Sequence, residues 1–171
     1  MTADSTLSDV RPAEQGPPPP WARRIGLTVL LLIVIAGALG VFGVHSRTNQ
    51  VESGGYSLKV TYPQVARAGL DVAFHVAVHH PGGFDGQITI QISTDYFHLF
   101  ETQGFFPDAA SSANNGRFVS FTFDEPSSDN FRLDYDAYIQ PAAQTGKSAT
   151  VRLVMHGAIV ASTTLHTWLL P

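Results

Sequence analysis

From Tyr56 onward, apolar and polar side chains alternate along the chain with a period of two. The longest regular run covers residues 131–139, where apolar side chains stand at the odd positions and mainly charged ones stand between them. Similar runs cover residues 56–62, 70–78, 88–92, 118–123, 149–155 and 159–170. A period of two is typical of strands that bury one face. The pattern therefore predicts seven or eight short strands, the last two of which form a hairpin.

The strand runs are separated by turn signals rich in proline, glycine and asparagine, and no stretch after Tyr56 has a helical period. This organisation predicts an all-β domain over residues 56–171, built as an immunoglobulin-like or fibronectin-like antiparallel sandwich. A jelly roll or a small barrel has the same alternation and remains an alternative. The chain has no cysteine, which excludes the inter-sheet disulfide of antibody domains.

The apolar segment Ile25–Val44 differs from the rest because its twenty residues include no charge. Twenty helical residues extend ~30 Å, which is the thickness of a bilayer's hydrocarbon core. A core helix of a soluble protein would show regularly spaced polar positions, and this segment shows none. The pattern predicts one transmembrane helix over residues 25–44.

The charges beside this segment predict its orientation. Arg23 and Arg24 directly precede it, whereas Arg47 is the nearest base after it. The positive-inside rule then places the N-terminus in the cytoplasm and the β domain outside, in a single-pass protein of the cell membrane. The sequence Ala36-Gly37-Ala38 also has the small-x-small form of a signal peptidase site, so a cleaved signal peptide is the alternative to an uncleaved anchor.

Two polar segments flank the apolar one. Residues 1–24 include four consecutive prolines and carry too few apolar side chains for a core, which predicts a disordered, proline-rich cytoplasmic tail. Residues 45–55 are polar and end in Gly54-Gly55, which predicts a flexible stalk.

Small residues at the end of the apolar segment predict a contact with another helix. Ala36, Gly37, Gly40 and Gly43 would share one face of a continuous helix, and small residues four apart allow a second helix to approach closely. The contact would join the chain to another membrane protein or to a second copy. Membrane helices are rich in glycine in any case, so plain composition is the alternative.

Composition excludes several functions. A net charge of −4 provides no basic surface for nucleic acid. The chain lacks a Gly-x-Ser-x-Gly elbow, a His-Glu-x-x-His motif and a phosphate-binding glycine loop, so we expect no enzyme and no catalytic residue. Its seven histidines are scattered without metal-ligand spacing, and we expect no metal and no cofactor.

Aromatic residues are concentrated in the segment 94–107, which includes Tyr96, Phe97, Phe100, Phe105 and Phe106. Such side chains either fill one end of the core or stand exposed as anchors for a partner. Because Phe105 and Phe106 are adjacent, one of the two is expected to face outward. The five aromatics are therefore candidate partner contacts.

Several motifs resemble those of small bacterial membrane-anchored proteins that carry an immunoglobulin-like extracytoplasmic domain. The motifs are Tyr62-Pro63 at a strand end, PGGF at 81–84, DYFHLFETQGFFP at 95–107, LDYDAYIQP at 133–141 and TLHTWLLP at 164–171. Eight arginines against two lysines fit a GC-rich bacterial gene. The resemblance implies no established activity, cofactor or catalytic residue.

Together these features predict a non-catalytic, membrane-anchored interaction or accessory module, with another membrane protein as its partner. The alternative is a surface domain that binds a ligand, either a cell-wall glycan or a metal ion. A glycan-binding domain would expose aromatics in a groove beside polar groups, whereas a docking module would present a flat patch or an open edge strand.

Overall fold

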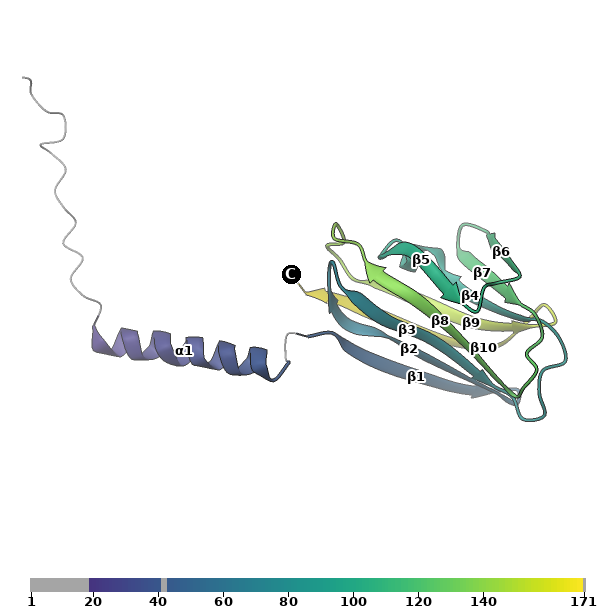
Figure 1. The fold of residues 1–171 in the computed structure, drawn as a ribbon, viewed down its shortest axis with the longest axis horizontal. Coiled ribbons are helices and arrows are strands. Elements are labelled where there is room, and N and C mark those ends of the chain that lie inside the picture. Colours follow the sequence, from purple (N-terminus) through teal and green to yellow (C-terminus); the bar gives the residue numbers. More distant parts are fainter. Residues whose placement is uncertain (1–18, 41–42, 171) are drawn as a thin grey trace, which may run out of the picture. The chain divides into compact units, whose positions relative to one another are not determined.

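The computed structural model describes residues 19–40 and 43–170, apart from the side chains of residues 102 and 103. The chain divides into a helical unit up to Phe42 and a β unit from Gly43 onward (Figure 1). Positions 1–18 of the predicted tail lie outside the described residues.

The helical unit contains helix α1, Pro20–Ala38. Proline suits the first turn of a helix because its missing N–H would have no partner there. The helix begins before the predicted span of residues 25–44 and ends earlier, in a turn where Gly40 has a φ of +70°. None of its residues is buried. Among the described residues, α1 is the one helix long and apolar enough to cross a membrane, and a signal sequence would have the same properties.

The segment predicted as a flexible stalk is instead mostly strand β1, His45–Ser53. It pairs antiparallel with β2, Tyr56–Arg67, from Ser53 opposite Tyr56 to His45 opposite Val65. The prediction was wrong because nearly every β1 side chain is exposed, so the strand has no apolar alternation. Its backbone pairing with an apolar neighbour is what orders it.

Ten strands occur in the described part of the β unit, against the seven or eight expected. After β1 and β2 they are β3 (Asp71–His79), β4 (Ile88–Ser93), β5 (Phe100–Phe106), β6 (Ser111–Asn114), β7 (Phe118–Phe123), β8 (Asn130–Ile139), β9 (Lys147–Met155) and β10 (Ala158–Leu170). A short helix, α2 (Thr94–Phe97), links β4 to β5. The strand order is β5-β8-β3-β2-β10-β9-β4-β7-β6, with β1 on β2.

Strand β10 joins the two halves of this sheet. Up to Thr167 it pairs antiparallel with β9, which confirms the predicted hairpin. Its last three residues, Trp168–Leu170, pair parallel with Val65–Arg67 of β2. The sheet is therefore mixed, and the expectation of antiparallel strands alone was wrong at this one pairing.

The sheet curls so that strands far apart in its order share one hydrophobic core. Phe123 of β7 and Phe131 of β8 have ring centroids 5.0 Å apart, although these strands are not hydrogen-bonded neighbours. Phe105 of β5 lies 4.3 Å from Phe121 of β7 by the same measure. The residues that alternation marks as apolar therefore face one another across the curl.

Candidate functional site

The structure separates the five aromatic residues predicted as partner contacts. Tyr96 and Phe100 are 1% and 2% exposed and belong to the core. Phe97 and Phe105 are half-buried and pack against Phe121. Four of the five thus fill the core, and the prediction of a contact surface was wrong for Tyr96 and Phe100, which are covered by their own domain.

Phe106 has the opposite environment, with 77% of its surface exposed. Neighbours on a strand point to opposite faces, so Phe105 turns inward and stacks on Tyr135 with ring centroids 4.5 Å apart, while Phe106 turns outward. This confirms that one member of the pair faces solvent. Phe106 ends β5, which is one edge of the strand order.

A groove of about 430 Å³ lies beside Phe106 on the outer face of β3, β5 and β8. Its lining includes Ala73, Gly104, Asp134 and Asp136. The groove is open to solvent, and its lining combines apolar and aromatic side chains with the carboxylates of Asp134 and Asp136. We refer to it as the Phe106 groove.

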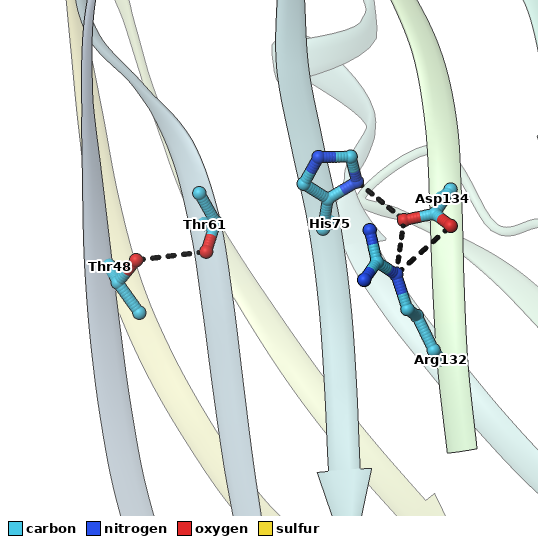
Figure 2. Close-up of polar contacts among 5 residues, drawn as sticks. All are labelled: Thr48, Thr61, His75, Arg132 and Asp134. Carbon is cyan, nitrogen blue, oxygen red and sulfur yellow. Dashed lines mark hydrogen bonds and ion pairs between the residues drawn. The ribbon is translucent and has the colours of Figure 1, made fainter.

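One row of paired residues crosses this outer face, from Thr48 in β1 through Thr61, His75 and Asp134 to Phe106 in β5. Figure 2 shows the polar part of the row. The two threonine hydroxyls lie 2.9 Å apart, within hydrogen-bonding distance. His75 contacts the Asp134 carboxylate through Nδ1. Polar contacts along the row therefore link β1 to β2 and β3 to β8, and the row ends at the exposed ring of Phe106.

Asp134 is held from two sides. Arg132 donates from Nε to both carboxylate oxygens of Asp134, at 2.8 and 3.0 Å, and His75 approaches from β3 (Figure 2). The two hydrogen bonds from Arg132 fix the direction of the carboxylate beside the groove. In the neighbouring residue, burial together with the carboxylate of Asp136 raises the pKa of Tyr135 to about 12, so its hydroxyl stays protonated at alkaline pH values where an exposed tyrosine ionises.

The histidines do not gather into a metal centre in the part of the chain that the structure describes. Adjacent His79 and His80 contact different partners: His79 lies 3.1 Å from the Asn130 side chain, and His80 lies 2.9 Å from the carbonyl oxygen of Gly55. His156 is paired with Asp85 at a hairpin. These three histidines thus have separate structural contacts.

A second cavity, of about 600 Å³, was not predicted from the sequence. It lies where β1 and β2 meet β10 and β9, and we refer to it as the Trp168 cleft. Its lining is mainly polar: Arg47, Asn49, Tyr62, Gln64, Ser93, Ser148, Ala149, Thr150, Thr164, Leu165, His166 and Trp168. Trp168 presents 60% of its surface to solvent.

Contacts within the cleft hold the rings of His166 and Trp168 in place. The His166 ring lies 4.2 Å from the Trp168 ring, between centroids, at an interplanar angle of 67°. Ser148 Oγ lies 2.7 Å from His166 Nδ1. His166 Nε2 is buried and has no hydrogen-bond partner among the described residues. Asn49 donates to the carbonyl oxygen of Thr164 at 2.8 Å, which joins β1 to β10 across the cleft.

Alternation in β10 explains which residues reach the cleft. Leu165 and Thr167 are buried, whereas His166 and Trp168 point to the other face. The TLHTWLL motif shows this alternation. Only the pairing of β10 with β2, about a hundred residues earlier, turns the outward face into a cleft, and that pairing has no local signal.

The small residues predicted to line one helix face are not on one helix. Ala36 and Gly37 lie in α1, Gly40 lies in the turn after it, and Gly43 follows the two undescribed residues. The prediction assumed a continuous helix to Val44. Since Gly40 has left-handed backbone geometry, the helix ends before this face is complete.

No protein family model matches the chain, and no curated protein matches it significantly. The Phe106 groove and the Trp168 cleft are the two surface features of the β unit that suggest binding.

Proposed function

We propose that the protein is a non-catalytic interaction module anchored in a bacterial cell membrane by α1, with a cytoplasmic N-terminus and an extracytoplasmic β unit. The absence of any buried residue in α1 supports the anchor, because its large apolar side chains otherwise face water. Arg23 and Arg24 at its start support the orientation. These features agree with the resemblance to single-pass bacterial proteins.

The β unit is proposed to be a variant of the immunoglobulin-like sandwich. The two runs β5-β8-β3-β2 and β10-β9-β4-β7 would form its layers. Support comes from the aromatic contacts between β7 and β8 and from the way β10 leaves β9 to pair with β2.

The observation that carries the interaction function is the exposure of Phe106. A phenyl ring that is 77% exposed costs solubility unless a partner covers it, and aromatic residues of this kind are common anchors at protein interfaces. Phe106 also lies on an edge strand beside a groove, so a partner would bury the ring and the groove together.

The charges around the groove indicate the partner's chemistry. Asp134 and Asp136 line it, and Asp108 follows two residues after Phe106. A complementary surface would have an apolar pocket for the ring and basic side chains around it. We therefore propose that the partner is the extracytoplasmic part of another membrane protein with such a surface.

Photocrosslinking in the native cell tests this function. A p-benzoylphenylalanine at position 106 should form one discrete crosslinked product that contains a second membrane protein. The same residue at position 159 is the matched control, because Ile159 is also an exposed apolar side chain but lies in β10. Asp136→Lys in the 106 variant should reduce the product several-fold by placing a positive charge against the basic surface.

Absence of a product from position 106, or equal products from 106 and 159, would contradict the proposal. A product that contains only this chain would replace the partner with a second copy.

A further inference from the structure

The Trp168 cleft is separate from the Phe106 groove and has different chemistry. The groove presents a phenylalanine beside carboxylates, whereas the lining of the cleft has no carboxylate and includes one arginine, two amides and several hydroxyls. Its volume of about 600 Å³ falls within the ordinary range of small-molecule sites. We propose that the cleft binds an acidic saccharide, a pyranose unit that bears a carboxylate.

Trp168 provides the surface for the sugar ring. One face of a pyranose presents C–H groups, and an exposed indole offers an apolar plane with a polar edge. Its large exposed area makes Trp168 accessible from solvent, and the ring borders the cleft rather than filling it. Among the described residues of the β unit, Phe106 is the other strongly exposed aromatic side chain, and its groove has carboxylates but no amides.

The polar lining matches the remaining groups of such a ligand. Asn49, Gln64 and the hydroxyl side chains of β9 and β10 offer both donors and acceptors, as sugar hydroxyls require. Arg47, the one arginine of the lining, is suited to a carboxylate because its guanidinium presents several N–H groups in a plane.

The cleft is also rigid enough to select a ligand. His166 packs against Trp168 and is itself held by Ser148. Directly before Trp168, Thr167 is fully buried and donates to the carbonyl oxygen of Pro63 at 2.6 Å. Sites whose walls are held before binding lose less conformational freedom when the ligand arrives.

A lipid surface is the competing explanation for an exposed tryptophan, since tryptophan is common where membranes meet water. The lining favours the saccharide, because a surface that inserts into lipid adds further exposed large apolar side chains, whereas amides and hydroxyls surround Trp168. Quenching of Trp168 by brominated lipids tests the lipid alternative.

Tryptophan fluorescence gives a direct assay. The chain has two tryptophans, and the other is Trp21 in α1. In the full chain reconstituted in nanodiscs, Trp21→Phe leaves Trp168 as the sole indole. Titration with trigalacturonate should change its emission in a saturable way, and neutral maltotriose should bind about tenfold more weakly, the difference expected of one charge-assisted contact.

Arg47→Gln should weaken trigalacturonate binding about tenfold and leave maltotriose binding unchanged. Arg117→Gln is the matched control, because Arg117 is exposed and lies outside the cleft lining, and it should change neither titration. Calorimetry with Trp168→Ala should show no binding of either sugar, while its unchanged circular dichroism would show that the domain still folds.

The proposal is overturned if trigalacturonate causes no saturable change up to about 10 mM. It is also overturned if Arg47→Gln binds like the parent, or if brominated lipids quench Trp168 without sugar, which would place the indole in the bilayer. Because crosslinking at position 106 does not involve Trp168, failure here would leave the proposed interaction function standing.

Discussion

The hydroxyl group of Tyr96 lies 2.7 Å from that of Thr167, although the two residues are 71 positions apart. Thr167 donates in turn to the carbonyl oxygen of Pro63. Helix α2, strand β10 and strand β2 are thus joined by one buried chain of hydrogen bonds. The chain ends beside Trp168, so it supports both the closure of the sheet and one wall of the cleft.

We predict that Thr167→Val destabilises the β unit more than Tyr96→Phe. Tyr96→Phe removes one hydrogen bond but leaves Thr167 bound to Pro63, at a cost of about 1 kcal/mol in the free energy of unfolding. Thr167→Val leaves both the Tyr96 hydroxyl and the Pro63 carbonyl buried without this partner, which costs about 2–3 kcal/mol. Urea denaturation of both single variants and the double variant measures the difference. Additive effects would show that the two hydroxyls are not coupled.

High pH should destabilise the β unit through its tyrosines. Burial raises the pKa of Tyr96, and burial with the charge of Asp136 raises that of Tyr135 to about 12, against about 10 in an unfolded chain. At pH values above about 10 and below the raised pKa values, the folded state retains tyrosine protons that the unfolded state releases. The free energy of unfolding should therefore be unaffected by these groups below pH ~10 and fall above it, by up to about 1.4 kcal/mol per pH unit for each buried tyrosine.

Denaturation at a series of alkaline pH values, with tyrosinate absorbance recorded alongside, measures this effect. Tyr135→Phe should make the decline shallower. A decline of equal slope in that variant would show that Tyr135 does not contribute.

Gly146→Ala should disturb the end of β10. A Cβ at this position would overlap the carbonyl oxygen of Thr167, and that atom belongs to the backbone, so a side-chain rotation cannot relieve the clash. We expect a loss of about 2 kcal/mol or more in the free energy of unfolding, together with an altered emission of Trp168. Gly104→Ala is the control, because a Cβ there meets no atom within 4 Å. If Gly146→Ala is as stable as this control, the close approach has no energetic weight.

Asp134→Ala should cost little stability, although Asp134 has two charged or polar partners. The carboxylate is about one-third exposed, and such pairs contribute about 0.5–1 kcal/mol after solvent screening. Thermal denaturation at low and high salt should show a small loss that salt reduces further. A loss as large as that of Thr167→Val would mean that the contact with His75 organises β3 and β8.

The proposed orientation predicts which cysteines are accessible from outside the cell. A cysteine at Ser53 should react with a membrane-impermeant maleimide on intact cells, whereas one at Ser5 should react only after lysis. The reverse result would contradict the orientation. A mature protein that begins near Leu39 would show that α1 is a cleaved signal peptide.

Sequence alternation predicted the strands that bury one face, such as β3 and β8, because burial imposes a period of two on their side chains. It missed β1 and β6, whose side chains are almost all exposed, since backbone pairing with a neighbour needs no apolar alternation. It also missed β5, whose sequence has no regular period of two. The adjacency of Phe105 and Phe106 predicted that one of the two faces outward, but not that it is Phe106. The Trp168 cleft could not be predicted from the sequence, because it depends on a parallel pairing between distant segments that no local pattern indicates.

The position of β10 also governs the order in which the protein can be made. This strand lies between β2 and β9 in the sheet, yet it follows all the other strands along the chain. While the chain is being synthesised, the two halves of the sheet therefore expose their apolar faces, the edge of β9 and the last three residues of β2, which later pair with β10. Contacts between segments so far apart form slowly, and open strand edges invite aggregation during the delay. The nascent domain should thus depend on chaperones until translation has passed residue 170.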